Sequence, residues 1–283
     1  MYVCMLLVLS RLKKNKRLTR IMPYNTTGAS HAEGVKNEKD IKDTMNVTNG
    51  GSLKLDELYG GPMYFKQIGG TKSVSDMDGF SAESGERKCG SSIKKHKGST
   101  GTFDYVNTSK LKDYLPEESV NRIKSGILDI RTRYHGDESK INIARNEKNI
   151  LLDQEFVHFT DVVIKSLLKK INSRNPELII VNDVQNRKLK CYKESSFHEL
   201  AVEPYNGSNV YTLKKGRGKT SRSILRNGVS INLRLRIELN NGVGALLGGF
   251  GKKNKNSSVT IKVQQESVDK LLATTELYSE CEY

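Results

Sequence analysis

The sequence predicts a protein of the α/β (α+β) class, with a mixed sheet core flanked by helices and a β-rich C-terminal region. Helical and strand-like runs alternate between residues 51 and 185, whereas short alternating runs between Gly and Asn turns dominate from residue 186 onward. The 283 residues are 36% hydrophobic and contain 24 glycines, which suits a folded protein with a polar tail. We therefore expect a disordered basic tail at 1–50, a core at 51–185 and a basic β-rich region at 186–283 packed on the core.

The first 50 residues carry no sustained apolar period, and the stretch from Pro23 to Gly51 is mostly Asn, Thr, Gly, Lys and Glu, which is typical of disorder. The apolar run at residues 1–10 is about half of the ~20 residues that a membrane helix needs. We expect an intracellular protein that is not secreted and has no membrane partner. Met22 follows this run closely, which leaves open a start of translation there.

The four cysteines, Cys4, Cys89, Cys191 and Cys281, are widely scattered and include no Cys-x-x-Cys pair. The spacing therefore argues against both a disulfide framework and a zinc finger.

The core begins with a short helix and three strands. Leucines at residues 53–58 cover one side of a helix that glycines end, and residues 63–68 form a strand candidate between glycine pairs. The runs 73–80 and 89–97 flank the polar, turn-rich stretch 81–88, which predicts a β-hairpin.

The rest of the core is expected to hold a loop, two helices and a strand. Residues 98–109 read as a loop, and a short helix begins near Pro116. Apolar residues recur at helical spacings from 148 to 171, which predicts one long helix, and residues 177–183 follow as a short buried strand. Four alternating runs and a terminal helix near 266–272 complete the β-rich region.

The charge points to a polyanionic partner. The formal net charge is +15, and eleven Lys and Arg stand against one acid, Glu238, between residues 207 and 255. The region lacks an aromatic ladder, which favours double-stranded DNA over stacked single strands. The stretch around Gly216 is no P-loop, because the first glycine of that motif would fall on Leu213. The expected DNA-binding residues of this region are Lys214, Lys215, Arg217, Lys219, Arg222, Arg234 and Arg236, unless the loop is simply a solvated surface.

The hairpin places acids and a lysine on one face. If the turn centres on Ser84 and Gly85, Asp76 lies opposite Ile93, between Ser92 and Lys94, and Asp78 lies near Ser91. Two carboxylates and a lysine suit phosphodiester hydrolysis with Mg²⁺, for which Mn²⁺ can substitute. The alternative is that both acids are surface residues beside a solvated basic strand.

At these residues the chain resembles PD-(D/E)XK restriction-endonuclease-like nucleases of the kind found in phages and large DNA viruses. The resemblance covers roughly residues 53–183, through the element order and the stretch GGTKSVSDM…GSSIKKHKGSTGTFDYVNTS. It implies that Asp76 binds the metal, that Lys94 is the catalytic lysine and that Glu57 is a possible acid on the first helix. The sequence departs from the family pattern at Ser92, which stands where the family has Asp or Glu. Either Asp78 or Glu57 then supplies the missing charge, or the site is impaired.

Two further readings concern the neighbouring residues. The segment Glu86-Arg87-Lys88 is a literal Glu-x-Lys, which would need the hairpin to turn near Ser81, and we rank it second. The run that follows Lys94 is expected to contact phosphate, although a histidine beside lysines is more often simply exposed. These expected phosphate contacts are Lys95, His96 and Lys97.

The sequence thus predicts a metal-dependent, restriction-like DNA endonuclease that hydrolyses phosphodiester bonds in double-stranded DNA. The resemblance also implies a homodimer, because cutting both strands usually takes two active sites. Two alternatives stay open, namely a catalytically inactive DNA-binding protein on the same fold and a basic viral packaging or structural protein. Metal binding separates the enzyme from both.

Overall fold

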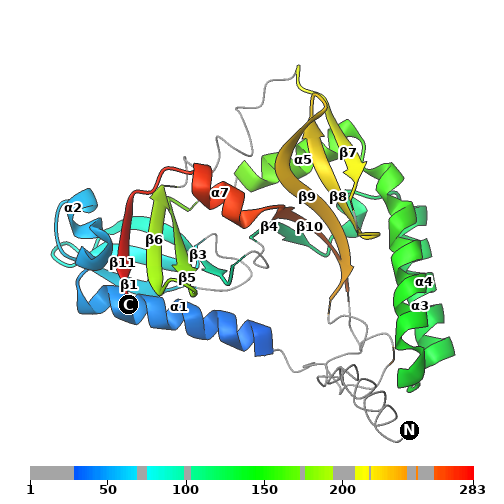
Figure 1. The fold of residues 1–283 in the computed structure, drawn as a ribbon, viewed down its shortest axis with the longest axis horizontal. Helices are drawn as coiled ribbons and strands as arrows, with labels where there is room; N and C mark the ends of the chain where they lie inside the picture. Colours follow the sequence, from blue (N-terminus) through cyan, green and yellow to red (C-terminus); the bar gives the residue numbers. More distant parts are fainter. Residues whose placement is uncertain are drawn as a thin grey trace, which may run out of the picture.

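The computed structural model contains two sheets with helices flanking them, which confirms the predicted fold class (Figure 1). It describes residues 29–68, 75–98, 103–172, 176–193, 208–216, 218–240, 247 and 258–283.

The first sheet has six strands in the order β1-β2-β3-β5-β6-β11. Strands β1, β2 and β3 form an antiparallel meander, whereas β3 pairs with β5 in parallel, after a crossover that contains helices. The predicted hairpin is therefore present, as β2 and β3. The six strands are β1 (Met63–Gln67), β2 (Met77–Ser81), β3 (Arg87–His96), β5 (Leu178–Asp183), β6 (Lys188–Lys193) and β11 (Ser279–Glu282).

One face of this sheet carries an apolar core beneath α1 (Ala29–Val47), η1 (Gly51–Leu53) and α2 (Leu55–Tyr59). Met77 and Cys89 on the hairpin alternate with polar residues, so the hairpin presents its apolar side chains to this core and its polar ones to the opposite face. Strand β5 is buried along its whole length because a second apolar cluster covers its other face.

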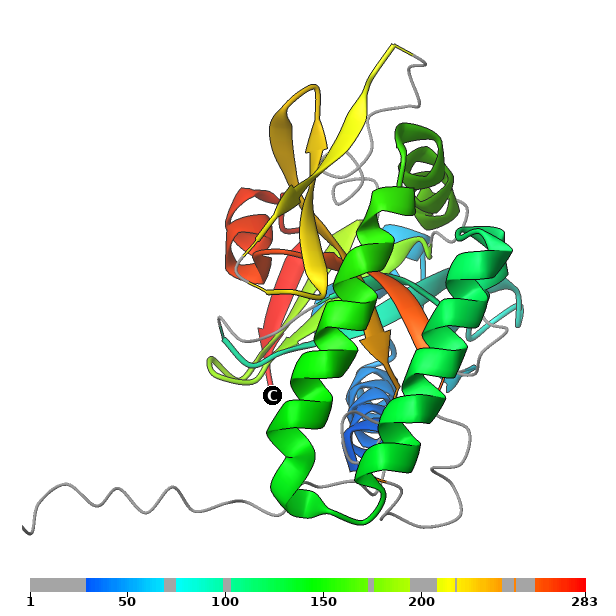
Figure 2. The same ribbon diagram turned by 90° about the vertical axis from the view of Figure 1, so that its right-hand side faces the viewer.

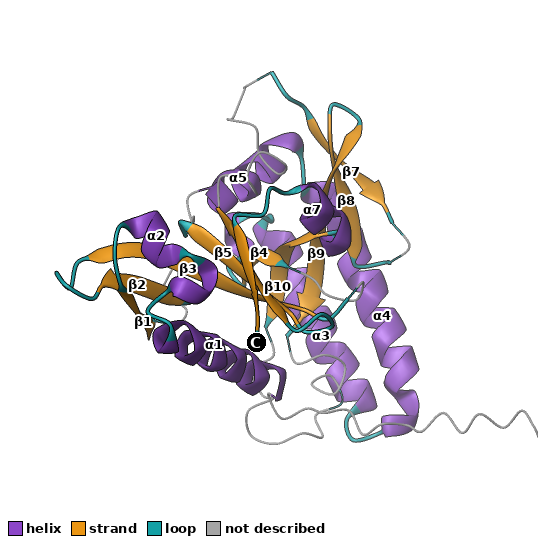
Figure 3. Ribbon diagram, turned by 60° about the vertical axis from the view of Figure 1, so that its left-hand side comes forward, coloured by secondary structure: helices purple, strands orange, loops and turns teal. Residues whose placement is uncertain are grey.

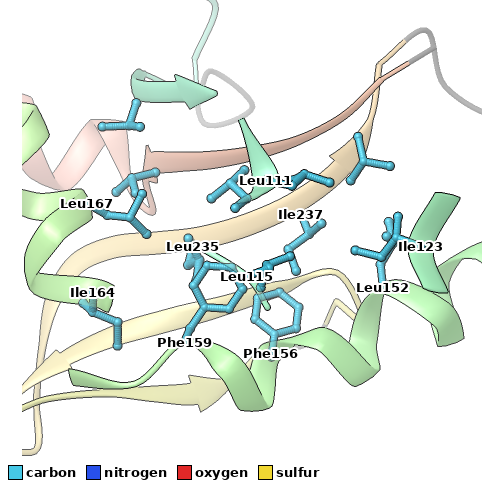
Figure 4. Close-up of a cluster of buried hydrophobic side chains, with 14 of the residues drawn as sticks. Leu111, Leu115, Ile123, Leu152, Phe156, Phe159, Ile164, Leu167, Leu235 and Ile237 are labelled. Atoms are coloured by element: carbon cyan, nitrogen blue, oxygen red, sulfur yellow. The ribbon is translucent and has the colours of Figure 1, made fainter. Parts of the chain in front are cut away.

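The second sheet has the strand order β4-β10-β9-β8-β7 and is antiparallel throughout. Helices cover one of its faces, and the largest apolar cluster of the described residues fills the space between them (Figures 2 and 4). The strands are β4 (Asp104–Thr108), β7 (Tyr211–Lys215), β8 (Ser221–Arg226), β9 (Val229–Leu239) and β10 (Val259–Gln265). The helical elements in this part of the chain are η2 (Leu111–Asp113), α3 (Glu117–Tyr134), η3 (Glu138–Lys140), α4 (Ile141–Gln154), η4 (Glu155–His158) and α5 (Asp161–Asn172).

Helix α7 (Val268–Thr274) links the two sheets, because it follows β10 of the second and precedes β11 of the first (Figures 1 and 3). Its Val268 and Leu271 pack against Phe103 and Val181, on the face of the first sheet opposite α1. The polar face of the hairpin therefore lies on the same side of its sheet as α7 and the second sheet.

The division of the chain differs from the expected one in two places. The segment 29–47 is helix α1 rather than a disordered tail, whereas residues 1–28 lie outside the described part. The boundary at residue 185 does not separate the sheets, because β6 and β11 belong to the first sheet and β4 to the second. Strand pairing between distant segments decides this arrangement, and no local pattern reports it.

Three local expectations are also wrong. The helix expected at 148–171 is broken into α4, η4 and α5, because Phe159 turns into the core and Thr160-Asp161 start a new helix. The helix near Pro116 is long rather than short, and part of the expected loop 98–109 is strand β4.

No helix in the described ranges is both long and apolar enough to span a membrane.

Helix α1 is expected to contribute strongly to stability. Met45 is fully buried against the first sheet, whereas Val47, two residues later, is 85% exposed. Met45→Ala should lower the free energy of unfolding by about 2–5 kcal/mol, because it leaves a cavity in the core. Val47→Ala is the matched control and should change it by less than about 0.5 kcal/mol. Urea unfolding of both variants tests this, and equal stabilities would show that α1 does not pack as described.

Candidate active site and nucleic-acid interface

Asp76 lies directly before β2 and contacts β3. The pairs Met77–Ser91 and Asp78–Gly90 put Asp76 opposite Ser92, one residue from the expected partner Ile93. A bulge after Gly79 and a turn that centres one residue earlier than expected cause this shift.

The carboxylate of Asp76 is oriented by β3. Its Oδ2 accepts a hydrogen bond from the backbone N–H of Ile93 at 2.7 Å and one from the Ser92 hydroxyl at 3.1 Å. Its Oδ1 has no partner among the described residues. Lys94 follows Ser92 on the same face of β3, and its Nζ donates one hydrogen bond, to the backbone carbonyl of Asp104 at 3.4 Å. One carboxylate oxygen and an ammonium group are therefore available on this face.

Asp78 shares the face of Asp76 but has a different partner. Arg87 contacts its carboxylate, with Nε at 3.1 Å from Oδ2, and also contacts Glu177 at the start of β5, at 2.9 Å. Burial alone would raise the pKa of Glu177, but the hydrogen bond from Arg87 and backbone N–H groups outweigh this effect and lower it. This cluster ties the hairpin to β5, which leaves Asp78 neutralised by an arginine.

The alternatives for the missing acid lie elsewhere. Glu57 is exposed on α2, and the buried Leu55 of that helix packs in the core on the opposite face of the sheet. Glu86 is in the hairpin turn, where it pairs with Lys88 at 2.6 Å, and the turn does not lie at Ser81 as the rival alignment needs. The expectation that Glu57 joins Asp76 is wrong, because the helix packs against the other side.

These residues fit a magnesium ion only as a partial ligand set. In the described ranges, no three His, Cys, Asp or Glu side chains come close enough together to hold a metal. Magnesium in nucleic-acid enzymes is commonly held by one or two carboxylates, with substrate phosphate and water completing the shell. Oδ1 of Asp76 meets the minimum of that description, so a metal here depends on the bound phosphate for its remaining ligands.

Asp104 on β4 joins this cluster to the second sheet. Its carbonyl accepts from Lys94, its Oδ1 accepts from Gln264 Nε2 at 2.5 Å, and its Oδ2 lies 3.2 Å from Lys262 Nζ. Burial alone would lower the pKa of Lys262, but hydrogen bonds and charges of Glu238 and Asp104 raise it overall. Asp104 is therefore the link between the hairpin and the strands that carry the basic residues.

A row of polar side chains crosses the face of the second sheet opposite the helices; it is exposed at Lys214 and buried at Gln264. The registers place one residue of each strand side by side, on the face opposite the helices. Four strand spacings make this row roughly 19 Å wide. The row is Lys214, Ser223, Arg234, Gln264 and Asp104. Together with Asp76, Ser92 and Lys94 we call it the polar band.

The basic residues expected on the β7–β8 hairpin divide into two groups. Lys214 is exposed and has no partner among the described residues, whereas Lys215 pairs with Asp153 and Lys219 donates to Asn146. Arg222 is buried beneath the sheet, where it contacts Asp153 and lies over the ring of Phe156, so a DNA-binding role for it is wrong. Arg217 lies outside the described residues.

The side chains of the three residues after Lys94 are also paired with acids of other elements. Lys95 and Lys97 both pair with Glu33 of α1, at 2.9 and 2.6 Å, and hydrogen bonds from the two lysines lower the pKa of Glu33 to about 2. His96 is buried, and its Nε2 lies 2.9 Å from Asp269 of α7. The expected phosphate contact of His96 is wrong, because its ring holds α7 against β3.

Sequence reasoning missed Asp104, Gln264, Lys262 and Glu238. Asp104 lay in the assumed loop, although the alternating buried residues Val106 and Thr108 are a strand signal. The other three stand at alternate or neighbouring positions of strands that were expected, but their partners become visible only in the sheet register.

The comparisons with known proteins add no family. No model of a known protein family matches the chain, and a search of curated proteins finds no match.

Proposed function

We propose that this chain binds double-stranded DNA over the polar band and hydrolyses a phosphodiester bond at Asp76 and Lys94. The observation that carries the proposal is that Asp76 and Lys94 lie on one face of the β2–β3 hairpin, next to Asp104 and the basic residues of the polar band. Residues 207–255, which hold most of the excess positive charge, include Lys214, Arg234 and Arg236 on this face.

The two residues would act in different ways on a bound phosphate. The Ser92 hydroxyl and the Ile93 N–H hold the Asp76 carboxylate so that its Oδ1, which has no partner among the described residues, is free to bind a cation or the attacking water. The Lys94 ammonium would stabilise negative charge that grows on the phosphate oxygens as water attacks. A Mg²⁺ ion, when bound, would supply further positive charge against those oxygens.

A cleavage assay tests the proposal directly. Supercoiled plasmid is incubated with the full chain and Mg²⁺ or Mn²⁺, with EDTA as the control, and duplex binding is measured on the same preparation. Cation-dependent nicking or linearisation supports the enzyme. Binding without cleavage by either ion supports the second candidate, and the lack of both overturns the proposal.

The second candidate is a catalytically inactive DNA-binding protein on the same fold. It is favoured by Ser92, which stands where an acid is expected, and by Asp78, whose charge Arg87 already neutralises. The polar band would then bind phosphate without cutting it.

The Ser92→Asp variant distinguishes a weak metal site beside Asp76 from the absence of a metal site. The substitution places a second carboxylate beside Asp76, on the side of β3 where we propose that the metal binds, so we expect cleavage to be kept or raised and divalent-ion affinity to rise. Cleavage rates and isothermal titration with Mn²⁺ measure both effects, and Ser92→Asn, which adds no charge, is the control. A folded Ser92→Asp protein that binds no more metal than wild type would contradict the metal-facing placement of Ser92.

A further inference from the structure

Two arginines on β9 are held in the same way. Arg234 donates from Nε to Gln264 Oε1 at 3.3 Å, and Nε of Arg236 lies 3.1 Å from Glu238 Oε2. The terminal nitrogens of both guanidinium groups donate no hydrogen bond in the described part of the chain. Each arginine is therefore anchored at its base while its two-nitrogen fork remains available.

The anchor of Arg234 is itself fixed by charge. Gln264 is buried, and its Nε2 donates to Asp104 Oδ1. Because a carboxylate can only accept hydrogen bonds, the amide nitrogen must face Asp104, and the amide oxygen is thereby turned toward Arg234. The orientation of this guanidinium is thus decided by Asp104, two strands away.

The anchor of Arg236 is part of the same network. Glu238 also accepts from Lys262 at 2.6 Å, and Lys262 reaches back to Asp104. Burial lowers the pKa of Lys148, and the positive charges of Arg236 and Arg145 lower it further against the charge of Glu238, so Arg236 lies close to other basic groups.

The spacing of the two forks matches DNA. Arg234 and Arg236 are two residues apart on a regular strand and point to the same side, which separates them by roughly 6.8 Å. Consecutive nucleotides of one strand of duplex DNA are about 3.4 Å apart along the helix axis. When β9 runs along that axis, the two forks therefore match two positions separated by one nucleotide.

From this geometry we infer that Arg234 and Arg236 are a pair of pre-oriented forks that each bind a group with two acceptor atoms, at alternate positions along one DNA strand. Asp104, Gln264 and Glu238 are the positioning residues that set their direction. The acceptor group is either the guanine edge formed by O6 and N7 or a phosphate, because both present two acceptors to a guanidinium. The inference rests on the proposed binding of duplex DNA.

The test exploits the difference between arginine and lysine. Arg234→Lys and Arg236→Lys keep the positive charge but remove the fork, so each should weaken duplex binding by roughly 10-fold at an unchanged salt slope. Arg187→Lys is the control, because Arg187 is exposed on the turn between β5 and β6, away from the polar band. Circular dichroism and urea unfolding confirm that each variant is folded.

The outcomes separate this inference from the proposed function. Wild-type affinity in both lysine variants would show that the arginines act as point charges, and would overturn the inference of bidentate binding alone. If the wild-type protein did not bind duplex DNA, both this inference and the proposed function would be overturned. Gln264→Leu should reproduce the loss seen for Arg234→Lys, and wild-type affinity in this variant would overturn the positioning role.

A set of duplexes with guanines at alternate positions, compared with duplexes without guanine on that strand, identifies the acceptor group. A loss confined to the guanine duplexes identifies the base edge, and an equal loss on all duplexes identifies the phosphate.

Discussion

Lys94→Ala and Asp76→Ala are each expected to reduce cation-dependent cleavage of duplex DNA by about 10²–10⁴-fold while leaving the fold and DNA affinity largely intact. Among the described residues, Lys94 makes a single hydrogen bond of 3.4 Å, to a backbone carbonyl, and both side chains are only partly buried, so their removal disturbs little packing. The loss should appear in the rate constant under single-turnover conditions rather than in binding, because these groups act on the reacting phosphate.

Glu86→Ala is the matched control for this prediction. Glu86 is an exposed acid in the turn of the same hairpin, and in the described part of the chain its side chain pairs only with Lys88, so its loss should change cleavage little. Cleavage by Lys94→Ala at the wild-type rate would show that the site is elsewhere, and a complete loss in Glu86→Ala would favour the Glu86-Arg87-Lys88 alignment. Supercoiled plasmid nicking, followed over time with saturating protein, measures all of these variants.

Arg222→Ala is expected to lower the free energy of unfolding by about 1–3 kcal/mol, because it removes the contacts of a buried guanidinium, although Asp153 keeps its ion pair with Lys215. The Arg222 guanidinium contacts Asp153 and donates to the carbonyl oxygens of Lys219 and Ser221 at 3.0 and 2.9 Å. It also lies 4.2 Å from the centre of the Phe156 ring, a cation–π contact that lysine reproduces poorly.

Lys214→Ala is the opposite case on the same β-hairpin. Lys214 is exposed on the polar band, so its removal should change stability by less than about 0.5 kcal/mol. It should weaken binding to every duplex and lower the log–log salt slope by about 0.9, the value for one lost phosphate contact. Urea unfolding and salt titrations of both variants test the pair. If Arg222→Ala kept wild-type stability but lost DNA affinity, the arginine would belong to the interface after all.

Much of the hairpin could be predicted from the sequence. Alternation along residues 73–80 and 89–97 shows the two strands, and the polar run between them shows the turn. The same alternation puts Asp76 and Asp78 on one face and Ser92 and Lys94 on the facing side of the partner strand. The bulge after Gly79 was not predictable, because it depends on how β2 and β3 pair in the folded sheet.

The prediction of one long helix at residues 148–171 was wrong for a physical reason. Apolar residues keep a helical spacing across Phe156 and Phe159, although the chain bends there to bury both rings, 6.0 Å apart. The gain from burying two aromatic side chains exceeds the cost of interrupting the helix. Helix α1 was missed because its few buried residues, Ile41 and Met45 among them, are diluted by polar ones.

The sequence by itself determined the fold class, the hairpin with Asp76 and Lys94, and the concentration of positive charge in the C-terminal region. Only the tertiary structure decided which basic residues remain available to an anion. Lys95 is paired with an acid 62 residues away, Arg222 with one 69 residues away and His96 with one 173 residues away. The side chains of a strand show their own alternation, but the identity of a cross-strand or cross-sheet partner depends on which segments pack together. Lys214, Arg234 and Arg236 therefore look like Arg222 in the sequence, and differ from it only because the folded sheet turns them to the face that the helices do not cover.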